Sequence, residues 1–245
     1  MLLKCTSTYP ATPENTNVLT IPHMRKLFGC EVGLSDHTMC VGADVAALGS
    51  ENVDLVFAPS VSEMYPSGFD SYVDIGRLTE YLEGEERPLH FRGVATIVCK
   101  LLAIVRPDRA YFGQKDAQQS LIVKRLNTDL NLGADIIIVP TVRDGDGVAV
   151  SSRNHYLSEE ERQAAVVLYR SLRLAQTMKG LGVRDGGHIK QQMREMIEKE
   201  PLVQMNYISI ADPETLEQID TVSRSALVLI GARVGNVRLI DNIQL

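Results

Sequence analysis

The stretch from residue 91 to 139 passes from helix to strand twice, and this alternation constrains the fold more than any other feature of the sequence. The segments "FRGVATIVCKLLAIVRP" and "DAQQSLIVKRLNTDLNL" have the apolar spacing of amphipathic helices, whereas "AYFG" and "DIIIV" have the pattern of short strands. Earlier in the chain, "VDLVFA" has the continuous apolar pattern of a buried strand. The predicted apolar stripes are Val94, Ile97, Val98, Leu101, Leu102 and Val105 in the first helix, and Leu121, Ile122, Leu126 and Leu130 in the second. Strands that alternate with helices predict an α/β fold with a parallel sheet.

After Pro140 the pattern changes. Two helices are predicted near residues 158–179 and 187–199, and then "VQMNYISIAD", "ALVLIGARVG" and "VRLIDNIQL" alternate as antiparallel strands do. We therefore predict two domains, with the parallel sheet in residues 1–141 and a smaller α+β domain in residues 142–245.

Composition excludes several function classes. The formal net charge is -6, from 25 basic and 31 acidic residues, and no basic run favours nucleic acid. The apolar runs are too short to cross a bilayer, and "MLLKCTSTYP" lacks the features of a signal peptide. The four cysteines form no C-x-x-C pair, which favours free thiols. We expect a cytoplasmic protein that binds neither nucleic acid nor membrane.

The stretch "YFGQKDAQQ" places a lysine where a predicted strand gives way to a helix. Gly113 allows a tight turn, and Lys115 and Asp116 follow it at the carboxyl end of the strand, where open α/β sheets bind ligands. A helix N-terminus beside a lysine favours an anion such as phosphate. The structural alternative is a capped helix, in which Asp116 satisfies free N–H groups and Lys115 is solvated.

A second polar stretch, "VAVSSRNHYLS", contains Ser151, Ser152 and Arg153, whose hydroxyl and guanidinium groups can hold phosphate oxygens. The structural alternative is a surface turn in which Ser158 caps the next helix. "DGDG" at 144–147 lacks the remaining ligands of a calcium loop and is predicted to be a flexible turn. The five histidines are scattered without metal-ligand spacing, so no metal ligands are predicted.

Taken together, these stretches resemble one family. "VDLVFAPSVSEMYPSG", "RPLHFRGVATIVCKLLAIVRPDRAYFGQKDAQQ", "VPTVRDGDGVAVSSRNHYLS" and "LIDNIQL" are similar to pantothenate synthetases, the pantoate–β-alanine ligases, over about residues 43–245. One departure is Leu89, which stands where the family usually has glycine before "HF". The resemblance implies a doubly wound, Rossmann-like nucleotidyltransferase sheet, a homodimer, and ATP with Mg²⁺ as cofactors.

The resemblance also implies a reaction and a role for each site residue. ATP and pantoate form a pantoyl adenylate with release of pyrophosphate, and the amine of β-alanine then displaces AMP. Lys115 is expected to contact phosphate and the reacting carboxylate, Gly113 and Asp116 the ribose, Gln119 the pantoate, and Val142 the adenine. The family's triphosphate-binding residues fall on Ser151, Ser152 and Arg153.

The N-terminal stretch departs from this family. The H-x-G-H motif, whose histidines bind phosphate, is absent, as is the F-V-N-P-x-Q-F stretch. Residues 1–42 instead resemble a fragment of sialic acid (N-acetylneuraminate) synthases, TIM-barrel enzymes in which the histidine of "SDHT", here His37, is a metal ligand. The chain is therefore interpreted as composite. Within this stretch we expect "LLKC" and "EVGL" to be parallel strands beside "VDLVFA", with covering helices at 18–29 and 43–52.

Three functions follow from these patterns. The first is an ATP-dependent carbon–nitrogen ligase that makes pantothenate, impaired by the missing histidine motif. The second is an inactive folded remnant or fusion that keeps part of the ATP and pantoate surface. The third is carbon–carbon bond formation of the sialic acid synthase kind, for which most of the required residues are absent.

Overall fold

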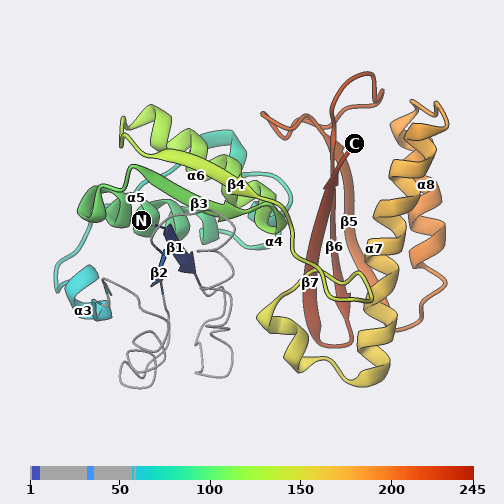
Figure 1. The fold of residues 1–245 in the computed structure, drawn as a ribbon, viewed down its shortest axis with the longest axis horizontal. Coiled ribbons are helices and arrows are strands. Elements are labelled where there is room, and N and C mark those ends of the chain that lie inside the picture. Colours follow the sequence, from blue (N-terminus) through green and yellow to red (C-terminus); the bar gives the residue numbers. More distant parts are fainter. Residues whose placement is uncertain (1, 6–31, 36–56, 58) are drawn as a thin grey trace. The chain divides into compact units, whose positions relative to one another are not determined.

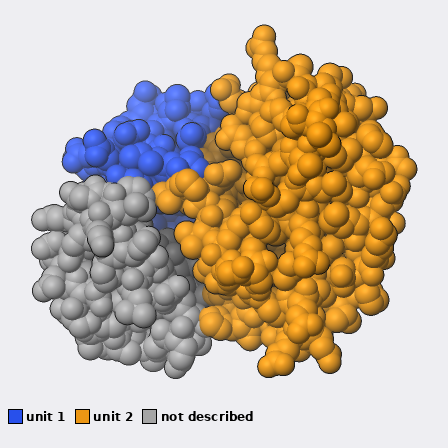
Figure 2. All heavy atoms as spheres, turned by 45° about the vertical axis from the view of Figure 1, so that its right-hand side comes forward, with its two compact units in different colours: residues 1–74, 92–112, 123–138 blue, residues 75–91, 113–122, 139–245 orange. Residues whose placement is uncertain are grey.

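The computed structural model describes residues 2–5, 32–35, 57 and 59–245 (Figure 1). The helices expected at 18–29 and 43–52 lie outside the described residues, as does the expected strand at 53–58 apart from Phe57. Two compact units divide the chain (Figure 2). Unit 1 consists of residues 1–74, 92–112 and 123–138, and unit 2 consists of residues 75–91, 113–122 and 139–245. The predicted boundary between residues 141 and 142 stays a prediction.

The N-terminal strands form a parallel pair, as the sequence predicts. Strand β1 (Leu2–Cys5) pairs with β2 (Val32–Ser35), with Leu2 opposite Val32 and Cys5 opposite Ser35. Parallel pairing needs a long connection between the two strands, and residues 6–31 are long enough to supply it.

The middle of the chain confirms the predicted order of helices and strands. Helix α5 (His90–Val105) precedes β3 (Arg109–Gly113), and α6 (Ala117–Asp129) precedes β4 (Asp135–Val139), which is hydrogen-bonded to β3. The predicted stripes form much of the buried side, with Leu102, Ile122 and Leu126 buried. Leu130 is an exception, because α6 ends at Asp129 and leaves that side chain exposed.

Before these elements lie three short helical segments. Helix α3 (Val61–Met64) begins with a capping box between Ser60 and Glu63. The 3₁₀ helix η2 (Gly76–Thr79) and helix α4 (Glu83–Glu86) follow it. Segment 75–91 belongs to unit 2, where Leu78 and Leu82 pack in a small cluster with Ala117, Leu216 and Leu229.

Unit 2 is built on an antiparallel sheet, which confirms the three predicted strands. Strand β6 (Leu227–Val234) lies between β5 (Val203–Ala211) and β7 (Val237–Gln244). Helices α7 (Glu159–Gly180) and α8 (Gly186–Ile197) lie side by side against this sheet (Figure 1). The core between them contains Leu172, Ile189, Met193, Ile197, Ile210 and Ile230, which are all fully buried.

The fold is therefore α/β with parallel strand pairing, followed by an antiparallel sheet covered by helices, as predicted. No helix in the described part of the chain is long and apolar enough to cross a membrane.

Leu89, just before α5, has an unfavourable backbone conformation. Its φ is 66°, in the left-handed region that glycine adopts without cost, and its side chain is 73% exposed. An exposed leucine therefore carries backbone strain here and gains little packing energy in return.

We predict that Leu89→Gly raises the free energy of unfolding by about 0.5–1 kcal/mol, because the relief of strain exceeds the added freedom of the unfolded chain. Urea denaturation at neutral pH measures the change. Leu89→Ala is the matched control, since it removes the exposed side chain but keeps the strained φ, and it should give no gain. An equal gain from both variants would show that the side chain, and not the backbone, causes the cost.

Candidate active site

The predicted lysine lies on a short turn between β3 and α6. Gly113 ends β3 in an extended conformation with φ −75°, so the backbone itself does not demand glycine there. A Cβ at Gly113 would meet no atom within 4 Å, which leaves open space beside the turn. Lys115 lies in the 3₁₀ helix η3 (Gln114–Asp116), with its Nζ atom 3.9 Å from Oδ1 of Asp116.

The capped-helix alternative for this turn does not match the geometry. Asp116 accepts no hydrogen bond from a backbone N–H of the described residues, so it does not cap α6. The Lys115 side chain is only 19% exposed, so it is not a freely solvated surface lysine. The ammonium group of this partly buried side chain has its paired carboxylate only at 3.9 Å and can interact with a further anion.

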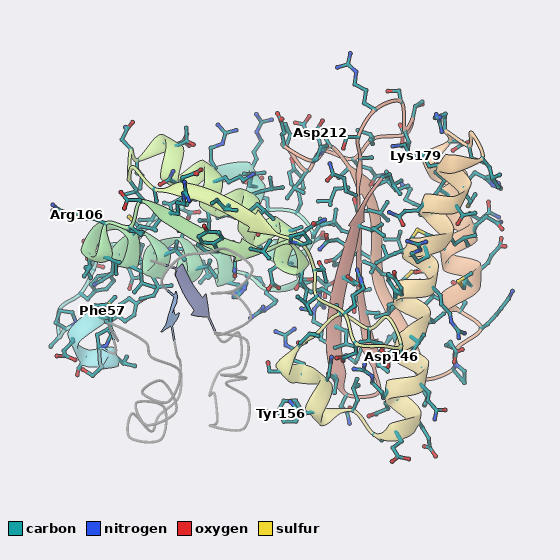
Figure 3. All side chains as sticks on the ribbon, viewed as in Figure 1. Phe57, Arg106, Asp146, Tyr156, Lys179 and Asp212 are labelled. Carbon is teal, nitrogen blue, oxygen red and sulfur yellow. The ribbon has the colours of Figure 1, made fainter. Side chains whose placement is uncertain are left out.

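The serine stretch forms a second short turn. Residues Ser152–Tyr156 form the 3₁₀ helix η4, and the Oγ of Ser151 accepts a hydrogen bond of 3.3 Å from the backbone N–H of Arg153. The Oγ of Ser152 is buried and has no partner among the described residues. Buried hydroxyls are almost always paired, so this one lacks the partner that such a group normally has. Tyr156, at the end of η4, is exposed (Figure 3).

The predicted cap of the following helix is also present. Ser158 and Glu161 form a capping box at the start of α7. The serine-rich stretch therefore supplies both a turn and a helix cap, and the cap uses neither Ser151 nor Ser152.

Lys115 and Ser151 come together in three dimensions although they are far apart in sequence. Both line one small pocket of unit 2, together with Asn154, Tyr169 and Asp241. The Oδ1 atom of Asn154 is buried there without a partner in the described part of the chain. The pocket thus combines one cation with one unpaired polar atom.

Positive charge gathers beside these turns. Burial lowers the pKa of Arg87, and the nearby cations Arg153 and Arg238 lower it further. Burial and Arg87 likewise lower the pKa of His90, whose neutral Nε2 accepts a hydrogen bond of 3.1 Å from Arg87. Arg153 donates one hydrogen bond, to the carbonyl oxygen of Arg238 at 3.2 Å, so most of its five N–H groups are unpaired within the described residues. This cluster can bind an anion.

Arg238, in contrast, is held by carboxylates. Its two Nη atoms lie 2.7 Å from Glu83 and 2.7 Å from Glu86, and the Tyr207 hydroxyl donates to Glu83 at 2.9 Å. Burial and the adjacent Glu83 raise the pKa of Tyr207, so the hydroxyl keeps its proton. Sequence analysis missed this network, as well as Arg87 and His90. Only the motif "RPLHF" could have drawn attention to the last two.

The comparisons with known proteins agree with these motifs. The family model described as pantoate–β-alanine ligase matches residues 16–244. The pantothenate synthetase of Roseiflexus sp. (strain RS-1) is 49% identical over 233 residues, which cover 95% of this chain and 84% of that relative. The chain belongs to the pantoate–β-alanine ligase family. Relatives of this kind are ATP-dependent ligases, as the sequence motifs predict.

Solved structures support the same assignment. The pantothenate synthetase of Thermus thermophilus matches with a TM-score of 0.87 and 36% identity, over 99% of this chain and 92% of that one. The pantoate–β-alanine ligase of Francisella tularensis, solved in complex with β,γ-ATP and β-alanine, matches with a TM-score of 0.70 over 99% of this chain and 88% of that one. At 24% identity that second match supports the fold alone.

The family likeness reaches further toward the N-terminus than the motifs predict. It begins at residue 16, within the segment 1–42 that sequence analysis compares with sialic acid synthases. The boundary expected near residue 43 therefore does not limit the ligase match. The sialic acid synthase resemblance and the composite origin stay predictions, and His37 lies outside the described residues.

The remaining predicted residues are Gln119 and Val142 of the ligase motifs. Gln119, in α6, is partly buried and makes no hydrogen bond to the described residues. Val142 is 64% exposed, which leaves its apolar side chain free to cover a flat ligand. Their roles toward pantoate and adenine stay proposals.

The acidic loop before the serine stretch is held in place by two arginines. Arg162 pairs with Asp144 and Asp146, each at 2.8 Å, which ties the tip of the loop to α7 (Figure 3). Arg143, at the base, makes a bidentate pair with the buried Asp241 of β7, at 2.6 and 2.9 Å. The predicted flexible turn is therefore anchored at its tip and at its base.

These two ion pairs should differ in strength. Asp241→Asn should lower the free energy of unfolding by about 3 kcal/mol, because it leaves the guanidinium of Arg143 uncompensated and poorly solvated. Asp144→Asn is the matched control. It removes an exposed partner from Arg162, which keeps Asp146, and should cost under about 1 kcal/mol. Denaturant unfolding of both variants measures the difference, and equal costs would refute the dependence on burial.

Proposed function

We propose that this chain catalyses the ATP-dependent condensation of pantoate with β-alanine through a pantoyl adenylate. The proposal rests on the ligase family match and on one observation, the meeting of Lys115 and Ser151 in a single pocket. A pantoate carboxylate oxygen attacks the α-phosphorus of ATP and pyrophosphate leaves. The β-alanine amine then attacks the acyl carbon, its nitrogen loses a proton to solvent, and AMP leaves with the electron pair of the broken C–O bond.

Both steps need negative charge to be stabilised and the reactants to be aligned. In our proposal the Lys115 ammonium contacts phosphate and the reacting carboxylate. Ser151, Ser152 and Arg153 hold the triphosphate. The unpaired Oγ of Ser152 and the unpaired N–H groups of Arg153 suit phosphate oxygens, and the cations around Arg87 would be favourably neutralised by them.

The nucleoside and pantoate are assigned to the residues around the lysine turn. The open space beside Gly113 suits close approach of a ribose, and the carboxylate of Asp116 can accept hydrogen bonds from its hydroxyls. We assign adenine to the exposed side chain of Val142 and pantoate to the free amide of Gln119.

For the second cofactor, Mg²⁺, the phosphates of the substrate are better ligands than the side chains of the described residues. Within residues 59–245 and the other described positions, no group of three or more His, Cys, Asp or Glu side chains could hold a metal ion. Magnesium is commonly bound through substrate phosphates with few protein ligands, so we propose that it enters with ATP. When bound, it would neutralise phosphate charge.

Two further proposals concern the chain as a whole. We propose a homodimer in the cytoplasm, and light scattering after size-exclusion chromatography would test the dimer. We also propose that turnover is reduced, because the 245 residues contain no H-x-G-H motif to bind phosphate. The inactive remnant is the limiting case of this reduction.

The first test is AMP release from ATP, Mg²⁺, pantoate and β-alanine. We expect turnover at least ~10²-fold below that of the same chain with the family's N-terminal segment restored, since one lost stabilising group typically costs about 10²–10³-fold. Turnover within about tenfold of the restored chain would refute the impairment. No pantoate-dependent AMP release from either chain would refute the ligase assignment.

The second test separates binding from folding. Lys115→Ala and Arg153→Ala should each weaken ATP binding about tenfold or more, measured by calorimetric titration, with a cooperative thermal transition retained. Lys199→Ala and Arg233→Ala are matched controls, since both residues are exposed and outside the site. A variant of Lys115 or Arg153 that loses its thermal transition would show that the residue is structural.

A further inference from the structure

Strand β7 lies against both turns of the candidate site within unit 2. Asn242 of this strand is 3% exposed and donates from Nδ2 to the carbonyl oxygens of Gln114 at 2.8 Å and Lys115 at 2.9 Å. Two successive carbonyls of the lysine turn are thus held by one side chain. The carboxamide of Asn242 must point its Nδ2 at these carbonyls, because Oδ1 in that position would meet two other acceptors and form no hydrogen bond.

The same strand also holds the loop that leads to the serine turn. Asp241 pairs with Arg143 at the start of that loop, and the Nη2 of Arg143 also donates to the carbonyl oxygen of Asn242 at 3.3 Å. The backbone N–H of Asn242 donates to Asp241 at 2.8 Å, which orients the carboxylate. Adjacent residues of one strand therefore fix both turns.

Besides the backbone hydrogen bonds of η3, side chains hold three successive carbonyls of the lysine turn. Ser120 donates to the carbonyl oxygen of Gly113 at 3.1 Å, and the next two carbonyls are the ones that Asn242 holds. The Lys115 ammonium is at the end of a long side chain, so a shift or rotation of its backbone moves the charge. A displacement of about 1 Å in a reacting group can cost about 10²-fold in rate.

We propose that Asn242 is a positioning residue of the ligase, whose carboxamide sets the place of the Lys115 ammonium by holding the backbone of residues 114–115. This inference rests on the proposed function of Lys115. Asn242 does not touch substrate in this proposal. It acts through the lysine, and its loss should matter only while the lysine is present.

A double-mutant cycle tests this dependence. Asn242→Ala should weaken ATP binding and lower the rate of AMP release between about 10- and 100-fold in the chain with Lys115. In the Lys115→Ala background the same substitution should change either quantity less than about twofold, because the group that it positions is already gone. A purely structural role would give the same factor in both backgrounds.

Asn127 provides the matched control. It holds backbone in the same manner, donating from Nδ2 to the carbonyl oxygen of Ala134 at 2.8 Å and accepting from its N–H at 3.2 Å, but it belongs to unit 1. Asn127→Ala should lower stability and leave ATP affinity unchanged in the folded protein. If Asn242→Ala does not fold, Asn242→Ser keeps one donor and should give a smaller, still lysine-dependent loss.

The outcomes separate the two proposals. If the unsubstituted chain binds ATP and the effects of Asn242→Ala and Lys115→Ala multiply independently, the positioning role is wrong and the ligase assignment stands. If neither the unsubstituted chain nor the chain with the family's N-terminal segment restored binds ATP or releases AMP, the proposed function is wrong and the positioning role falls with it. A lysine-dependent loss supports both.

Discussion

The bidentate pair between Arg143 and Asp241 is the interaction on which the candidate site depends. Asp241 is 5% exposed on the edge strand β7, where it lies opposite Ile230 of β6, so its charge is stable only with a closely held partner. That partner lies at the base of the loop leading to Ser151, and its guanidinium also stacks 4.2 Å above the ring of Tyr169 in α7. One buried charge therefore fixes the loop to both the sheet and a helix.

The geometry of a strand extends this effect to the lysine turn. Successive residues of a strand face opposite sides of the sheet, so Asp241 and Asn242 project in different directions from almost the same point. Asp241 holds the loop, and Asn242 holds the backbone of Lys115. On the side of Asn242, Arg238 holds Glu83. A single register shift of β7 against β6 would misplace all of these groups together.

The elements of this fold could be predicted because their signals are local. Apolar periodicity located α5, α6 and α7, and the strong cap at Ser158 fixed the start of α7. The motifs also identified Lys115 and Ser151, which meet in one pocket. The missing parts of the site are long-range contacts. Glu83 and Arg238 are 155 positions apart, and neither stretch carries a local pattern that points to the other. The backbone strain at Leu89 could be recognised only from its φ angle in the structure.

Two neighbouring glutamines of α6 differ in how many of their side-chain hydrogen bonds the fold already satisfies. In "DAQQS", Gln118 uses its whole amide, accepting from the N–H of Glu83 and donating to the carbonyls of Leu78 and Tyr81. Gln119, the next residue, has no hydrogen bond to the described residues. The two side chains are identical in the sequence, and only the fold shows that the hydrogen-bonding groups of one of them are all used within the protein.

The arginines divide in the same way. Both Nη atoms of Arg238 are paired with carboxylates at 2.7 Å, although its buried Nε has no partner among the described residues, whereas Arg153 makes one contact to a carbonyl oxygen. A partly buried guanidinium with unpaired donors is costly unless water or an anion completes its hydrogen bonds. Arg153, Gln119 and the hydroxyl of Ser152 are all left incomplete by the described residues, and the ligase motifs assign all of them to substrate. Because unmet hydrogen-bonding capacity carries no information about the family, it supports the proposed substrate contacts of these three residues independently of the motifs.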